Sequence, residues 1–436
     1  MLRRDSFDFT RIAAPWNLRF ASVVPAGIAR CGSADDVRTA LLWAEANNVP
    51  LAIRSGGHSY AGFSTTAGLL IDVSPMSHVA FDGESGRARL GGGARNTDVH
   101  ATFARLGRSI THGRCQGVGV AGLVLGGGVG FSQRLRGLTC DRLIETEIVT
   151  ASGELLRCSA EENADLFWAC RGGGGGNFGV NTSFTFDTFP VGVVTVFRLV
   201  WTSRLSDVLP ALLDHLPAMP DRFGCKFLVD AGQAERLELL GQFVGTEGEV
   251  TALLAPLLRS ARPAQQDMRT LPYWDAQDFL SEDDTPEYVH ERSRYLYRIA
   301  SAEGARTILD YLRRFPGTHA GANWKVFLAG GAVAKVAPDA TAFVHRQALM
   351  LSSIELNWTA DDDAATLARN ESWLAEFHAA MQPHASAECY QNFIDPAETN
   401  YLRAYYGTNL ERLVEIKRRY DPRNVFRFAQ SIPLSL

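Results

Sequence analysis

The chain lacks the features that mark membrane, secreted and nucleic-acid-binding proteins. No apolar run is long enough to span a bilayer, and the N-terminus meets Asp5 and Asp8 where a secretory signal needs an apolar core. The net charge is -5 at pH 7 without any basic tract, which argues against nucleic acid or an anionic membrane as a partner. We therefore expect a cytoplasmic protein, a monomer or a homodimer, whose partners are small molecules.

Cysteine is scarce as well. The seven cysteines are odd in number, widely scattered and never arranged as C-x-x-C. The sequence therefore predicts neither a disulfide framework nor a zinc site, and we expect no bound metal.

What the chain does have is enough length for two domains. Its 436 residues are 46% hydrophobic and 21% charged, as in a globular protein. Ser33 and the apolar spacing after it predict a helix over 33–48, and strands are expected at 49–54 and 68–74. After about residue 190 the pattern changes to alternating strands and amphipathic helices, which predicts a second domain.

Glycine is abundant and unevenly distributed. It gathers in three stretches, at 54–62 (RSGGHSYAG), 113–130 and 171–180. Gly117–Gly122 reads G-x-G-x-x-G, and Asp141 lies at the distance of ~20 residues downstream that a nicotinamide-dinucleotide fingerprint requires. However, the glycines at 126–128 interrupt any helix within one turn, and no persuasive strand precedes the motif. We favour a flavin bound by extended loops, because backbone N–H groups freed by glycine can cradle its pyrophosphate.

Four segments together resemble the berberine-bridge-enzyme-like flavoprotein oxidases of the vanillyl-alcohol-oxidase superfamily. They are RSGGHSYAGFSTTAGLLIDVS, GRCQGVGVAGLVLGGGVGFSQRLRGLTCD, ADLFWACRGGGGGNFGV and YYGTNLERLVEIKRRYDPRNVFRFAQSIP, in order between about Trp16 and Pro433. The resemblance implies a two-domain α+β fold with a discontinuous FAD-binding domain, residues 1–190 and 386–436. Residues 191–385 would form the substrate domain, an antiparallel sheet backed by helices.

The resemblance assigns a role to one histidine and one cysteine of these loops. His58 stands where the family's histidine bonds the 8-methyl group of FAD, and Cys115 where some members bond position 6 of the ring. An imidazole nitrogen and a thiolate are suitable nucleophiles for an electron-poor ring. The ordinary alternatives are a hydrogen-bonding loop histidine and an inert buried cysteine. We favour double attachment, which should raise the flavin potential and leave the site open to bulky substrates.

The resemblance assigns further cofactor contacts to the same loops. Ser55, Gly56, Gly57 and Ser59 would contact the pyrophosphate. Gly122, Gly126, Gly127 and Gly128 would contact the ring and the ribityl side. Gly176, Asn177 and Gly179 would form the inner wall of the cofactor site. Arg54, Val118, Gly119 and Asn392 complete the predicted set. The alternative for each glycine is a simple bend in the chain.

Tyr390, in CYQNF, matches a Y-x-N motif whose tyrosine is the catalytic base in many family members. A free tyrosine has a pKa near ~10, so the site must lower it through the flavin or a neighbouring cation; the alternative is a packed tyrosine. Lys335 falls where alkaloid-cyclising members carry a glutamate base on a strand, so we do not expect the bridge-forming reaction. Lys335 either assists Tyr390 or a substrate oxygen, or is a solvated lysine on a sheet edge. His345 and Arg346 match a family pair without a derivable role.

The leading functional hypothesis is an FAD-dependent oxidase acting on an alcohol of a carbohydrate or bulky secondary metabolite, with O2 reduced to hydrogen peroxide. Val118 stands where valine accompanies oxygen access in related enzymes, although Ala121 adds a methyl where glycine is common. The alternatives are a dehydrogenase with a non-oxygen acceptor and a non-catalytic flavin-binding protein. The aromatic residues Tyr273, Trp274 and Trp324 belong either to the substrate pocket or to the core.

Overall fold

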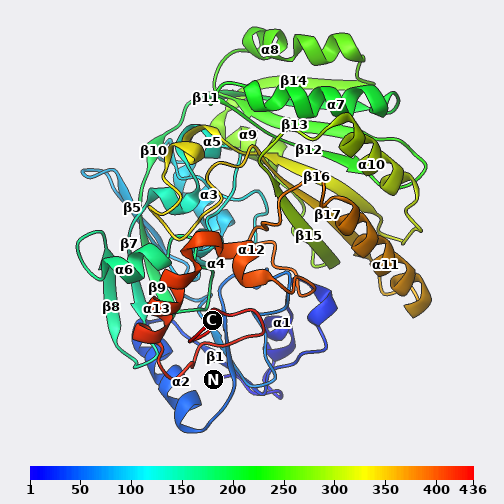
Figure 1. Ribbon diagram of the computed structural model, residues 1–436. Coiled ribbons are helices and arrows are strands. Elements are labelled where there is room, and N and C mark those ends of the chain that lie inside the picture. Colours follow the sequence, from blue (N-terminus) through cyan, green and yellow to red (C-terminus); the bar gives the residue numbers. More distant parts are fainter.

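The computed structural model describes residues 1–436, and its N-terminal half builds two main sheets around the glycine-rich loops (Figure 1). A parallel sheet has the strand order β1-β3-β2, and an antiparallel sheet has the order β4-β5-β9-β7-β8. The strands are β1 (Gly27–Arg30), β2 (Leu51–Arg54), β3 (Leu69–Asp72), β4 (Val79–Asp82), β5 (Arg87–Gly91), β7 (Leu143–Val149), β8 (Leu155–Ser159) and β9 (Val180–Asp187), besides the short pair β6 (Arg108–Ser109) and β10 (Phe189–Pro190). The helices are α1 (Phe9–Ala13), α2 (Ala34–Ala46), α3 (Asn96–Phe103), α4 (Val120–Leu125), α5 (Gln133–Arg136) and α6 (Ala164–Ala169).

A seven-stranded antiparallel sheet follows, with the order β14-β11-β13-β12-β16-β17-β15. Four helices cover its outer face, and α9 (Tyr273–Leu280) packs between its inner side and the N-terminal half (Figure 1). The strands are β11 (Val193–Trp201), β12 (Phe223–Asp230), β13 (Leu237–Phe243), β14 (Gln265–Pro272), β15 (Tyr288–Leu296), β16 (Ala322–Leu328) and β17 (Met350–Trp358). The outer helices are α7 (Leu205–His215), α8 (Glu247–Ser260), α10 (Ala302–Arg313) and α11 (Ala364–Ala380). This arrangement confirms the predicted fold class.

The C-terminal segment returns to the N-terminal half, as Figure 1 shows for the red helix α13 beside α6. It contains α12 (Tyr401–Tyr406) and α13 (Leu410–Tyr420). Arg419 and Tyr420 both bind Asp165 at 2.9 Å, which fixes α13 to α6. The division of the chain at residues 190 and 385 stays a prediction, although the large sheet and its helices lie within 193–380.

Local sequence signals account for several element boundaries. The predicted helix after Ser33 begins at Ala34, because the Asp36 N–H donates to Ser33 Oγ at 3.2 Å. A helix also begins inside the G-x-G-x-x-G stretch, at Val120, contrary to the argument made from the sequence. It ends at Leu125, however, because the glycines that follow take φ values of +116° and +87° at residues 127 and 128, outside the helical region.

Asp141 has a structural partner instead of a nucleotide ribose. Both of its carboxylate oxygens accept from the Arg346 guanidinium at 2.8 Å, and one also accepts from the Leu138 N–H. The bidentate pair leaves Asp141 no free oxygen for a dinucleotide, so the fingerprint is coincidental.

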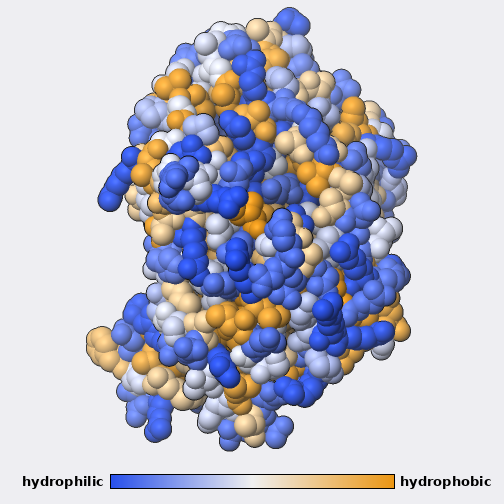
Figure 2. All heavy atoms as spheres, turned by 90° about the vertical axis from the view of Figure 1, so that its left-hand side faces the viewer, coloured by the Kyte–Doolittle hydropathy of each residue, from blue (hydrophilic) through white to orange (hydrophobic).

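No helix combines the length and apolar character needed to cross a bilayer. In the face shown in Figure 2, hydrophilic side chains predominate and hydrophobic side chains gather in small patches. All seven cysteines are free thiols.

Candidate active site

A cavity of about 730 Å³ is lined by the three glycine-rich loops, the C-terminal return and a loop of the large sheet. Its volume lies within the range of small-molecule sites. The residues that were predicted from sequence and line it are Ser55, Gly56, Gly57, His58, Ser59, Cys115, Val118, Gly119, Gly122, Gly176, Asn177, Gly179, Tyr390 and Asn392. Val425–Phe428 also line it, a contribution that the sequence prediction did not specify.

Four predicted contacts lie behind the cavity wall: Arg54 and the glycines at 126–128. Arg54 Nη1 donates to the carbonyls of Ile12, Ala13 and Ala14, so this buried guanidinium fixes the end of α1. A side chain at Gly126 would collide with Asn392, whose amide occupies that space. These four residues therefore shape the wall and do not face the cavity.

The first two loops touch backbone to backbone. A Cβ atom on Gly56 would lie 2.3 Å from the Gly119 nitrogen, so no larger residue fits there. The Ser55 hydroxyl beside this contact is buried without a hydrogen-bond partner. Glycine backbone at close approach and an unsatisfied hydroxyl are what a pyrophosphate-bearing ligand needs, so this part of the cavity fits FAD.

His58 and Cys115 line the same cavity. The His58 ring stacks on Trp16 with centroids 4.7 Å apart, and its Nε2 lies 3.1 Å from Asp284 Oδ1. The Cys115 thiol donates to Glu282 Oε2 at 3.5 Å. Burial raises the pKa of this thiol, and Arg114 only partly opposes the rise. The two acidic partners come from a loop more than a hundred residues away in sequence, which no local motif reveals.

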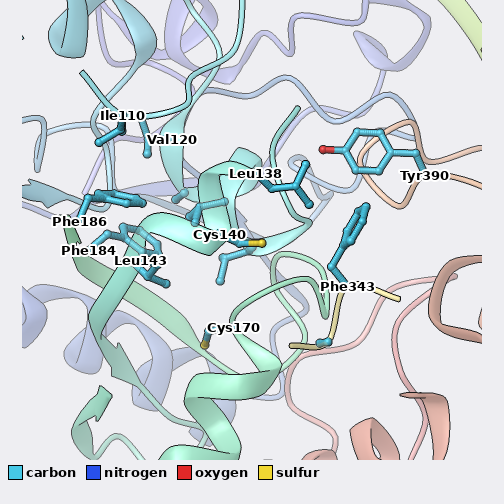
Figure 3. Packing of buried hydrophobic residues seen from close by; sticks show 14 of the residues in the cluster. Ile110, Val120, Leu138, Cys140, Leu143, Cys170, Phe184, Phe186, Phe343 and Tyr390 are labelled. Carbon is cyan, nitrogen blue, oxygen red and sulfur yellow. The ribbon is translucent and has the colours of Figure 1, made fainter. Parts of the chain in front are cut away.

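Tyr390 is 1% exposed, and its ring packs against Phe343, as Figure 3 shows. Its hydroxyl oxygen accepts from the Gly128 N–H and from Asn392 Nδ2, both at 3.0 Å. These donors favour the phenolate, but burial is the larger effect and raises the pKa of Tyr390. The expectation that a neighbouring cation lowers this pKa is wrong, because the groups that bind the oxygen are neutral N–H donors.

Lys335 does not meet Tyr390. It ends the 3-10 helix η4 (Gly331–Lys335), is 72% exposed at its side chain and pairs with Asp221 at 2.7 Å. The prediction of a strand in this segment is wrong, because Gly330 and Gly331 take positive φ angles that break an extended chain. Lys335 is thus a solvated lysine, on a helical turn and not on a sheet edge.

The His345–Arg346 pair is structural. Arg346 is fully buried against Asp141, as described above. His345 Nδ1 lies 2.8 Å from Glu388 Oε2, and its Nε2 lies 3.0 Å from the Tyr405 carbonyl oxygen. Together the two side chains fix the loop before β17 to the N-terminal half and to the C-terminal return.

Sequence reasoning missed a set of charged side chains on the inner face of the large sheet. Lys325 Nζ lies 3.1 Å from Glu291 Oε1 and also binds Glu355, while Lys226 and Arg114 both bind Glu282. We call this set the ionic cluster: Arg114, Lys226, Glu282, Glu291, Lys325 and Glu355. A signal existed, because Lys226, Lys325 and Glu355 each stand between two apolar residues of a strand.

The pKa values of the residues in the ionic cluster are shifted in different directions. Burial raises the pKa of Glu291, although nearby Lys325 partly opposes the rise. Burial acts in the same direction on Glu355, but Lys325, Asn323 and Lys226 together outweigh it, and the pKa of Glu355 is lowered. Burial, with Arg114 and Lys325 nearby, lowers the pKa of Lys226.

A row of aromatic rings extends from His58 to Lys325 of the ionic cluster. Tyr60 lies between Trp16 and Phe393, with centroid distances of 6.0 and 5.5 Å, and all three rings line the cavity. Lys325 Nζ lies 5.7 Å from the Phe393 ring. The aromatic residues weighed from the sequence, Tyr273, Trp274 and Trp324, are instead buried core residues.

Comparisons with known proteins agree with this site. The family described as "FAD binding domain" matches residues 25–159, and the family "Berberine and berberine like" matches residues 389–433. The chain is 34% identical to an uncharacterised FAD-linked oxidoreductase of Bacillus subtilis, with 99% of this chain and 96% of that protein covered. It is 31% identical to the glucooligosaccharide oxidase of Sarocladium strictum, with 97% and 90% covered.

A solved structure also matches this chain over its whole length. It is the glucooligosaccharide oxidase from Acremonium strictum, described with a 6-S-cysteinyl, 8α-N1-histidyl FAD. It superimposes with a TM-score of 0.90 at 26% identity and covers 100% of this chain and 97% of its own.

Proposed function

The chain belongs to the berberine-bridge-enzyme-like FAD-linked oxidoreductases, and on that premise we propose that it oxidises a CH–OH group of a carbohydrate or similarly polyhydroxylated compound. Hydride passes to FAD, and O2 reoxidises the cofactor with release of hydrogen peroxide. The observation that carries the proposal is one cavity that joins His58 and Cys115 to the ionic cluster, of which Arg114 and Glu282 are lining residues.

The proposed cofactor is FAD attached through both His58 and Cys115. Both side chains face the cavity whose glycine-rich wall fits a pyrophosphate. The doubly linked flavin of the Acremonium oxidase supports the same pairing here.

The proposed substrate class follows from the chemistry of the inner face of the large sheet, which we call the sheet face. Carboxylates and cations bind hydroxyl groups well, and aromatic faces such as those of Tyr60 and Phe393 suit the apolar face of a sugar ring. A mostly apolar alkaloid would bring no polar group to the ionic cluster and would exclude water from it, and desolvating charges without new partners is costly.

Tyr390 remains the proposed acceptor of the hydroxyl proton. The Gly128 and Asn392 donors at its oxygen would stabilise the phenolate, in the way that fixed N–H groups stabilise developing negative charge. Glu355 is the competing acceptor, because its lowered pKa keeps it ionised and its side chain is 16% exposed.

A peroxide-coupled screen tests the function directly. We expect peroxide in air with oligosaccharides or sugars, and none with apolar alcohols of similar size. Flavin reduction by a sugar without peroxide formation would indicate a dehydrogenase. Absence of flavin reduction by every substrate tested would contradict an enzymatic role in alcohol oxidation.

A further inference from the structure

One short acidic loop of the large sheet contacts both residues that are proposed to bind the flavin. We call Glu282–Asp284, which connects α9 to β15, the acidic loop. Glu282 Oε2 accepts the hydrogen bond of the Cys115 thiol, and Asp284 Oδ1 lies 3.1 Å from His58 Nε2. Each candidate nucleophile therefore has its own carboxylate.

The backbone holds this loop against the cysteine segment. Cys115 and Glu282 form a parallel β-bridge, so the two side chains are placed in register. A Cβ atom on Gly117 would lie 1.9 Å from Asp284 Oδ2, so only glycine leaves room for the aspartate. Asp284 Oδ1 is buried, and the polar atom that it contacts is His58 Nε2.

The two nucleophiles need such partners for different reasons. A thiol attacks only as a thiolate, and burial of Cys115 opposes its ionisation. A neutral imidazole attacks through the nitrogen that lacks the proton, and a carboxylate at one nitrogen keeps the proton there. With Asp284 at Nε2, the free electron pair of His58 lies on Nδ1.

We propose that the acidic loop makes the protein attach its own flavin: Glu282 takes the thiol proton of Cys115, and Asp284 holds and then takes the Nε2 proton of His58. This inference rests on the proposed double attachment. Arg114 and Lys226 both bind the other carboxylate oxygen of Glu282, Oε1, so Oε2 remains for the thiol proton.

The chemistry balances with O2 as the oxidant. At Cys115 one S–C bond forms while the thiol hydrogen and the hydrogen of the flavin carbon are given up. At His58 one N–C bond forms while the imidazole hydrogen and one hydrogen of the flavin methyl group are given up. In each case two electrons and two protons pass to O2, and each bond yields one molecule of hydrogen peroxide.

The test follows attachment by mass and not by turnover. Protein produced without flavin is mixed with FAD in air, and covalent adduct is measured over time by intact mass spectrometry after denaturation. In a His58→Ala background, Glu282→Gln should slow formation of the cysteine bond by ~100-fold, as expected for losing a general base. In a Cys115→Ala background, Asp284→Asn should slow formation of the histidine bond comparably.

Asp283→Asn is the matched control, because Asp283 is exposed and its side chain binds only Thr285. It should attach FAD at the wild-type rate. Higher pH should restore cysteine attachment in Glu282→Gln, since hydroxide then supplies the thiolate, a rescue that a misfolded variant would not give. Wild-type rates in both test variants would overturn this inference, whereas a wild-type protein that gains no covalent FAD would overturn the proposed attachment itself.

Discussion

A buried lysine of the predicted FAD-binding part of the chain, residues 1–190 and 386–436, which we call the FAD half, and a buried glutamate of the sheet face are partnered differently. In the FAD half, Lys417 Nζ binds Asp421 at 2.7 Å and the Asn177 carbonyl at 2.8 Å. On the sheet face, Glu291 is equally buried, but its cation, Lys325 at 3.1 Å, is shared with Glu355. Fully partnered charges stabilise a fold, whereas incompletely partnered ones retain the capacity to bind a ligand. The contrast agrees with the proposed division of roles, in which the FAD half holds the cofactor and the sheet face meets the substrate.

The largest expected effect tests the cofactor side. His58→Ala and Cys115→Ala should each keep covalent FAD through the remaining bond, and the double variant should lose it completely. Glu355→Gln, on the sheet face, should keep both bonds. Intact mass spectrometry of denatured protein measures all four, and a wild-type mass equal to the bare chain would refute the assignment.

The next largest effect tests whether Tyr390 or Glu355, on the sheet face, accepts the substrate proton. Tyr390→Phe should slow anaerobic flavin reduction by roughly 10²–10⁴-fold, the range for loss of a general base, with FAD content unchanged. Because burial raises the pKa of Tyr390, the wild-type rate should keep rising with pH beyond the usual tyrosine range. Stopped-flow reduction measures both quantities. Near-normal reduction in Tyr390→Phe together with a large defect in Glu355→Gln would move the acceptor to the sheet face.

A smaller effect, on stability, tests the claim that the FAD-half charges are structural. Lys417→Met leaves Asp421 buried and unpaired, since both side chains have 0% exposure. The free energy of unfolding should fall by about 3–5 kcal/mol, as for other broken buried pairs. Urea denaturation measures it, with the exposed Lys335→Met as the control, expected within ~0.5 kcal/mol of wild type. Equal losses in the two variants would contradict the contrast.

The same contrast explains what the sequence allowed us to predict. The glycine-rich loops are contiguous, so the residues around His58 and Cys115 and the overall fold could be inferred from local motifs. The ionic cluster comes from β12, β15, β16 and β17 and two loops, and only the pairing of these strands brings its charges together. Lys335 was misplaced for the related reason that an ungapped match assumed a strand where two glycines with positive φ begin a turn.

The smallest expected effect concerns Glu287, at the junction of the two regions. Its backbone N–H donates to the Trp16 carbonyl, and its carboxylate accepts from Asn357 Nδ2 at 2.9 Å. Burial, reinforced by nearby Glu355, raises the pKa of Glu287 to about 7. Since the ordinary value of 4.5 is lower, its contribution to stability is complete below pH 4.5 and is lost as pH rises towards 7.

Glu287→Gln removes this titration while keeping a side chain of the same shape. Thermal unfolding of wild type and variant should therefore coincide near pH 4.5 and diverge as pH rises, with the variant more stable by ~1 kcal/mol at pH 8 after allowance for partial exposure. Glu376→Gln, on the solvent side of α11, is the control for a glutamate outside this junction. If the unfolding temperatures of wild type and Glu287→Gln changed with pH in parallel, the charge of the Glu287 carboxylate would already be compensated by its neighbours. In that case the sheet face at this point would be as fully partnered as the FAD half.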